Sequence, residues 1–95
     1  MNSENYINVC LTLNEELYKV REKLEEENKL KADDYFTTFS YQTDGYSDLI
    51  TFNDFYIWSS EADVSVESEE ELISILRKKV SNMAVIIAIW FQEYK

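Results

Sequence analysis

The sequence predicts an α+β domain in which two long helices flank a small antiparallel sheet of two to four strands. Apolar residues recur at helical spacing near both ends of the chain, whereas the middle holds a run of alternating β-branched and aromatic residues. The dipeptide Asp44-Gly45 lies beside that run and is a strong signal for a β-hairpin. The predicted order of elements is therefore α-β-β-(β)-α, and a chain of 95 residues is expected to form a single domain over residues 1–95.

The first helix is predicted to run to about Ala32. Its successive apolar residues are three or four positions apart, which places them on one face of a helix: Tyr6, Cys10, Leu13, Leu17, Val20 and Leu24. Lys29 and Lys31 suit the negative end of the helix dipole, whereas Asp33 and Asp34 oppose it, so the helix should end between these pairs.

A strand is predicted to begin at Tyr35. From there to Tyr41 nearly all residues are β-branched or aromatic, and they alternate as a half-buried strand requires. Gly45 accepts the positive φ angle of a hairpin turn, so the chain should reverse direction there.

The residues after the hairpin allow two interpretations. Leu49–Phe52 and Phe55–Ser59 are either two strands joined by a turn at Asn53-Asp54, which we favour, or one bulged strand. Val64 and Val66 have the spacing of a short fourth strand.

The last helix is predicted to begin at Ser68. Ser68 and Glu71 have the spacing of a capping box, in which the hydroxyl and the carboxylate each accept a hydrogen bond from a backbone N–H at the helix start. The second half of this helix is apolar on every side, so it is either buried between the sheet and the first helix or used as a homodimer contact. The residues predicted for the dimer interface are Val85, Ile86, Ile89 and Trp90.

Charge is unevenly distributed along the chain. Residues 32–76 contain eleven Asp and Glu residues and no Lys or Arg, so this segment accounts for the net charge of −10. The same residues include nine of the fourteen aromatic side chains. An acidic surface without internal counter-charge repels nucleic acid and attracts basic partners.

Two explanations of this acidic segment are open at the level of sequence. Carboxylates on strand edges and loops keep a protein soluble and discourage aggregation. Alternatively they bind a basic protein, because side chains two residues apart on a strand are about 6 to 7 Å apart and can engage successive basic groups. Acids in the first turn of the last helix are explained by its dipole. The carboxylates least explained by local structure, and therefore predicted to bind a partner, are Asp33, Asp34, Asp44, Asp48, Asp54, Glu61 and Asp63.

The sequence offers little for catalysis or for a cofactor. It contains no histidine and no recognisable pair of nucleophile and base, so we predict that the protein is not an enzyme. The loop around Asp44 and Asp48 lacks the repeated ligands of a calcium site, and no metal or other cofactor is predicted.

Cys10, the only cysteine, lies on the apolar stripe and is predicted to be buried rather than reactive. The basic triplet at residues 77–79 is too short to bind nucleic acid and is predicted to neutralise nearby acids, either in its own chain or in a second subunit.

The sequence also predicts a cytoplasmic protein. Its first residues lack the basic and then apolar pattern of a secretory signal. The longest apolar run, Met83–Phe91, is shorter than the roughly 20 residues that a membrane-spanning helix needs. A single cysteine agrees with a reducing compartment.

The acidic zone from Asp33 to Glu71 and the build of two helices with a small sheet are similar to those of small phage or mobile-element proteins. Within that class the chain resembles anti-CRISPR inhibitors and other nucleic-acid mimics, whose acidic faces occupy the nucleic-acid channel of a nuclease. Immunity proteins that neutralise basic nuclease toxins resemble it equally in charge. This resemblance to a class implies an inhibitor that acts in the host-cell cytoplasm. Because no motif is shared, the resemblance assigns no function to any particular residue.

We therefore expect a small acidic inhibitor that binds the basic nucleic-acid-binding surface of a nuclease or another nucleic-acid-binding protein. Binding to nucleic acid itself or to a membrane is not expected. The alternatives are a structural adaptor that docks partner helices on its apolar stripes and a toxin immunity protein.

Overall fold

The computed structural model describes residues 1–28, 37–63 and 65–81. Their order of elements is α1 (Ser3–Glu26), β1 (Phe39–Thr43), β2 (Asp48–Phe52), β3 (Phe55–Ser59) and α2 (Glu69–Ser81). This confirms the predicted α+β class, with three strands in one antiparallel sheet of order β1-β2-β3.

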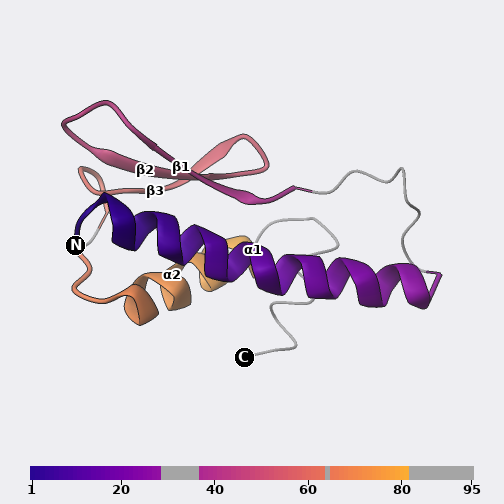
Figure 1. Ribbon diagram of the computed structural model, residues 1–95. Coiled ribbons are helices and arrows are strands. Elements are labelled where there is room, and N and C mark those ends of the chain that lie inside the picture. Colours follow the sequence, from indigo (N-terminus) through magenta and orange to yellow (C-terminus); the bar gives the residue numbers. More distant parts are fainter. Residues whose placement is uncertain (29–36, 64, 82–95) are drawn as a thin grey trace.

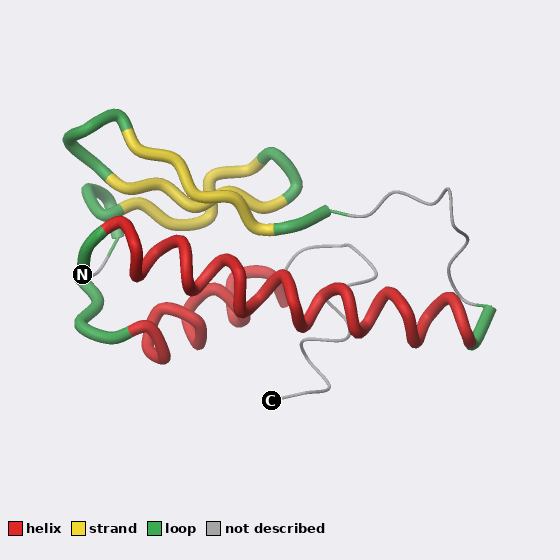
Figure 2. The backbone as a smooth tube through the Cα atoms, viewed as in Figure 1, coloured by secondary structure: helices red, strands yellow, loops and turns green. Residues whose placement is uncertain are grey.

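The described elements form two layers (Figure 1). The sheet is one layer, and α1 and α2 lie side by side on one of its faces, with α1 against β1 and β2 and α2 against β3 (Figure 2). Both helices run in the same direction, because Asn5 of α1 bonds to Glu69 at the start of α2 and Glu16 pairs with Arg77 further along. Both helix N-termini therefore lie at the end of the molecule that also carries the β1–β2 hairpin loop (Figure 1).

Helix α1 begins at a reciprocal cap and ends earlier than predicted. The side chain of Asn2 accepts a hydrogen bond from the backbone N–H of Asn5, and the side chain of Asn5 accepts one from Asn2. The last helical residue is Glu26 rather than one near Ala32, because Asn28 adopts a left-handed conformation with φ of 57°, which ends a helix. Residues 29–32, which were expected to be helical, lie outside the described residues.

Strand β1 begins at Phe39, whereas the sequence predicted a start at Tyr35. The pair Phe39–Phe52 is the last one in the β1–β2 ladder, because β2 turns into β3 immediately after Phe52. Thr37 accordingly has no strand partner, and its hydroxyl accepts a hydrogen bond from the backbone N–H of Asn53 at 3.0 Å. Tyr35 itself lies outside the described residues.

The structure contains both a turn and a bulge after the first hairpin, at different positions. Asn53 and Asp54 have φ angles of 54° and 64°, as a two-residue hairpin turn requires, and they join two separate strands as favoured. The register then shifts between Ile50 and Thr51, which leaves Ile57 as an extra residue opposite β2. The bulge turns Ile57 and Trp58 toward the core together, and both are buried.

The segment between β3 and α2 contains no further strand among its described residues. Val66 is buried in the core, and Val64 lies outside the described residues. The predicted helix start is confirmed, since the Ser68 hydroxyl accepts from the backbone N–H of Glu71 at 3.1 Å. The Glu71 carboxylate, however, accepts from the N–H of Glu67 rather than from that of Ser68.

A single core fills the space between the helices and the sheet. The α1 stripe is buried as predicted from Tyr6 to Val20, whereas Leu24 is only half-buried. Burial raises the pKa of the Cys10 thiol to about 11. Leu72, Leu76 and Val80 of α2 are fully buried against the stripe and the sheet. The residues predicted for a dimer interface, Val85, Ile86, Ile89 and Trp90, lie outside the described residues, so that interface stays a prediction.

Candidate functional site

The hairpin loop between β1 and β2 holds its shape through Asp44. The Asp44 carboxylate accepts hydrogen bonds from the backbone N–H groups of Ser47 at 2.9 Å and Tyr46 at 2.8 Å. These bonds lower the pKa of Asp44, which therefore keeps its charge to unusually low pH. Gly45 has a φ of 92°, and Tyr46 at the tip is 97% exposed. Asp44 is thus both a structural residue of the turn and an exposed anion.

Asp48 connects the hairpin to the start of α1 and to the loop after β3. Its carboxylate accepts a hydrogen bond of 2.5 Å from the hydroxyl of Tyr41, which also bonds to Ser3. Its backbone N–H donates to the Ser60 hydroxyl and its carbonyl accepts from the Ser60 N–H. Burial, followed by the nearby charge of Asp48, raises the pKa of Tyr6, which stacks on Tyr41.

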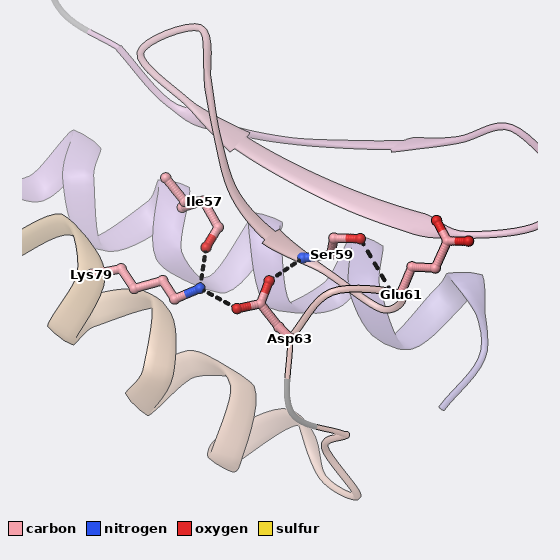
Figure 3. Close-up of polar contacts among 5 residues, drawn as sticks. All are labelled: Ile57, Ser59, Glu61, Asp63 and Lys79. Carbon is pink, nitrogen blue, oxygen red and sulfur yellow. Dashed lines mark hydrogen bonds and ion pairs between the residues drawn. The ribbon is translucent and has the colours of Figure 1, made fainter.

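Asp63 does not face solvent as an unpaired anion. One oxygen accepts from Lys79 Nζ at 2.6 Å and the other from the backbone N–H of Ser59 at 2.8 Å (Figure 3). Lys79 Nζ also donates to the carbonyl of Ile57 at 2.6 Å, so it ties α2 to β3 and the following loop. Burial alone would raise the pKa of Asp63, but the bonds from Lys79 and Ser59 and the charge of Lys79 outweigh it and lower the pKa.

The Glu61 and Asp54 side chains are exposed and form no hydrogen bond or ion pair with any described residue, but they lie far apart. The Glu61 carboxylate points away from Asp63 and Lys79 (Figure 3). Glu61 follows β3 at the hairpin end of the molecule, whereas Asp54 is in the β2–β3 turn at the opposite end of the sheet (Figure 1).

Because the two helices are parallel, carboxylates from both helix N-termini lie at the same end of the molecule as Asp44, Asp48 and Glu61. The Asn5 side chain donates to Glu69 at 2.8 Å, which brings the first turn of α2 beside the first turn of α1. We call the resulting cluster the acidic end, and its carboxylates are Glu4, Asp44, Asp48, Glu61, Glu67, Glu70 and Glu71.

The described Lys and Arg side chains belong to other parts of the helices than the acidic end, although Lys79 reaches the loop after β3, where it pairs with Asp63. No Lys or Arg precedes Lys19, and none occurs between Ala32 and Leu76. Lys19, Arg21 and Lys23 belong to the distal half of α1, and the basic triplet 77–79 belongs to the last turns of α2. The charge of the described residues is therefore unevenly distributed along the molecule.

Two residues of the basic triplet neutralise acids within their own chain. Arg77 forms an ion pair with Glu16 of α1, and Lys79 pairs with Asp63. This agrees with the first of the two roles predicted for the triplet, and these pairs hold the helices to each other and to the loop after β3.

The structure brings together only some of the carboxylates predicted to bind a partner. Asp44, Asp48 and Glu61 lie at the acidic end, whereas Asp54 lies at the other end of the sheet and Asp63 is engaged by Lys79. Asp33 and Asp34 lie outside the described residues. Sequence reasoning missed Glu4 because it belongs to a different part of the chain, and it set aside Glu67, Glu70 and Glu71 because first-turn acids are explained by the helix dipole.

A small cavity opens at the acidic end. It has a volume of about 180 Å³ and is lined by Met1, Tyr6, Trp58, Ser60, Ser65 and Val66. The indole N–H of Trp58 is buried without a hydrogen-bond acceptor among the described residues. The cavity offers hydroxyl groups and aromatic rings to an incoming side chain next to Asp48.

The described part of the chain holds no group of three or more Cys, Asp or Glu side chains arranged to bind a metal ion. Likewise, neither described helix combines the length and apolar character that crossing a bilayer would require.

Comparisons with known proteins add no relative. No protein-family model matches the chain, and no match was found among curated proteins or solved structures.

Proposed function

We propose that this protein is a small acidic inhibitor that binds the basic nucleic-acid-binding surface of a nuclease or another nucleic-acid-binding protein. The acidic end would occupy the site that otherwise receives phosphate groups. No catalytic step and no cofactor is part of this proposal.

The observation that supports the proposal is the separation of charge in three dimensions. Seven carboxylates from four separate segments lie at one end, and none of them forms an ion pair with a Lys or Arg side chain among the described residues. Clustered carboxylates repel each other, and a cationic site that accepted them would relieve this repulsion.

Solubility alone would not require this arrangement. A soluble surface usually mixes both signs of charge, and three of the described acids outside the acidic end are paired with cations. Glu16 pairs with Arg77, Glu25 with Arg21 and Asp63 with Lys79. The lack of such pairing at the acidic end therefore favours binding over solubility as its role.

A two-stage experiment tests the proposal. The protein is first used to capture basic proteins from a cell lysate, and each captured protein is then assayed for binding of a fluorescent DNA or RNA duplex with and without the inhibitor. We expect the protein to displace the nucleic acid. Its affinity for the captured protein should fall steeply between about 50 and 500 mM salt, because salt screens exposed charges. The affinity should change little between about pH 6 and 8, because the sequence contains no histidine.

Two matched variants locate the binding surface. The first replaces Glu4, Glu61, Glu67 and Glu70 by Gln, all exposed carboxylates of the acidic end. The second makes an equal change in charge elsewhere, with Glu15, Glu22 and Glu26 to Gln and Asp54 to Asn. We expect the first variant to lose most of its affinity and the second to retain it.

Equal losses in both variants, or displacement that is indifferent to salt, would contradict the proposal. Asp44 and Asp48 are left unchanged, since their bonds to the hairpin backbone and to Tyr41 make them poor test positions.

A further inference from the structure

Strand β1 has backbone groups at the edge of the sheet that no described residue pairs. Asn14 bonds to both the backbone N–H and the carbonyl of Phe39, so these two groups point away from β2. Backbone groups alternate in direction along a strand, so the N–H and carbonyl groups of Tyr41 and Thr43 also point away from β2. These four groups form no hydrogen bond with a described residue, because β1 is the outer strand of the sheet. We call them the open edge.

The opposite edge of the sheet, at β3, is covered. Asp63 accepts from the backbone N–H of Ser59 with its carboxylate, and its own backbone N–H donates to the Ser59 carbonyl. Lys79 donates to the carbonyl of Ile57 (Figure 3). Edge strands without such cover usually carry charged side chains, proline or a bulge, which discourage pairing with another chain. Strand β1 has none of these, so the open edge is suited to pairing with a further strand.

A strand added at the open edge would also cover an exposed apolar side chain of α1. Ile7 is 45% exposed and precedes Asn14 by about two helical turns, so the two residues lie on the same side of α1. Asn14 reaches the outer edge of β1, and the N-terminus of α1 lies at the hairpin end of the molecule (Figure 1). Ile7 is therefore on the side of α1 that an added strand would face.

The open edge leads directly to an exposed anion of the acidic end. Asp44 follows Thr43, and the hairpin backbone holds its carboxylate in place. A segment antiparallel to β1 would begin beside Thr43, so the residues that precede its paired part would lie next to Asp44. Lys or Arg at those positions would face a carboxylate that has no ion pair with a described cation. The occupant that fits both the backbone groups and the charge is an extended basic segment.

We infer that a basic partner contributes such a segment, which pairs with β1 as a fourth, antiparallel strand of the sheet. The open edge would supply its hydrogen bonds, Ile7 an apolar contact and Asp44 the opposite charge. That the segment comes from a nucleic-acid-binding protein rests on the proposed function, whereas the strand pairing itself does not.

The test uses the full chain and a synthetic peptide of about ten residues, in which two lysines precede alternating valine and threonine. Amide hydrogen exchange is measured for each residue by NMR. The amides of Tyr41 and Thr43 should exchange rapidly in the free protein, and saturating peptide should slow both at least tenfold. The Tyr56 amide is the internal control and should not change, because it points outward from β3 at the opposite edge of the sheet.

Two matched peptides separate the hydrogen bonds from the charge. N-methylation of alternate residues removes the N–H donors on the side that faces β1, while the charge and the side chains stay the same. This peptide should give no protection of Tyr41 and Thr43. Replacing the two lysines by glutamates keeps the donors and should weaken binding at least tenfold.

Three results would overturn the inference. The first is rapid exchange of Tyr41 and Thr43 at about 2 mM peptide, and the second is equal protection by the N-methylated peptide. The third is slow exchange of both amides in the dilute free protein, since another segment of the chain or a second copy would then occupy the open edge.

The same measurement on a complex with a captured basic protein separates this inference from the proposed function. Displacement of nucleic acid with Tyr41 and Thr43 still exchanging rapidly would contradict strand pairing and leave the proposed function intact. Protection of both amides without displacement of nucleic acid would support strand pairing and contradict the proposed function.

Discussion

Asn14 joins α1 to the edge of the sheet, and its removal gives a quantitative test of the fold. Its side-chain amide donates to the carbonyl of Phe39 at 3.0 Å, and its side-chain oxygen accepts from the N–H of Phe39 at 2.8 Å. Asn14 thus bonds to both the backbone N–H and the carbonyl of Phe39, as a residue of a neighbouring strand would. Each hydrogen bond contributes about 0.5–1.5 kcal/mol, so Asn14→Ala should lower the free energy of unfolding by about 1–3 kcal/mol, apart from the effect of alanine on the helix.

Asn8→Ala is the matched control for this prediction. Asn8 is exposed in the same helix, and its side chain forms no hydrogen bond with a described residue. Replacing Asn by Ala raises helix stability by up to about 0.7 kcal/mol at either position, so the difference between the two variants isolates the bonds to Phe39. Urea unfolding followed by circular dichroism measures this difference, which should shift the midpoint by about 1–3 M at a slope of about 1 kcal/mol/M. Equal stability of Asn14→Ala and Asn8→Ala would refute the role assigned to Asn14.

Three further predictions concern single side chains. Lys79→Met should lower the free energy of unfolding by about 1 kcal/mol at neutral pH, because it removes a partly exposed ion pair and the bond to a backbone carbonyl. The effect of Lys79→Met should become smaller in acid. The pKa of Asp63 is lower in the folded state than its unfolded value of about 3.9, so the Asp63 carboxylate stabilises the fold above that value. This stability is lost as the pH falls from about 3.9 through the folded pKa. The Cys10 thiol, buried and with a pKa of about 11, should react with a disulfide reagent at pH 8 only in urea, and rapid reaction without urea would show that the helix face is open. Gly45→Ala should cost about 1 kcal/mol through its φ of 92° rather than through any clash, and Gly45→Asn should cost less, as measured by thermal unfolding.

Local patterns in the sequence predicted the helices and strands but not all of their first and last residues. The hairpin at Gly45, the turn at Asn53 and the cap at Ser68 depend on the residues that form them, so they were found correctly. The start of β1 depends instead on where β2 ends, which is a property of the paired strand. The end of α1 depends on a left-handed Asn28, a conformation that Asn permits without requiring it.

The candidate site was harder to predict because it is assembled from distant segments. The sequence showed that residues 32–76 lack cations, but the acidic end also needs the first turn of α1 and excludes Asp54 and Asp63. The separation of Asp54 follows from strand connectivity, since consecutive hairpin turns lie at opposite ends of a sheet. The pairing of Asp63 with Lys79 spans sixteen positions and has no periodic signal.

Because the two helices are parallel, the carboxylates of the acidic end should contribute unequally to the affinity for a basic partner. The parallel arrangement places two helix N-termini, each with a partial positive charge, at the acidic end. Glu4, Glu70 and Glu71 lie in those first turns, so the dipoles stabilise them in the free protein and their pairing with a partner gains less. Glu61 has neither a dipole nor a contact with a described cation. If electrostatic repulsion within the free protein is what a basic partner relieves, Glu61→Gln should therefore cost more affinity than Glu70→Gln, although both remove one exposed charge from the acidic end.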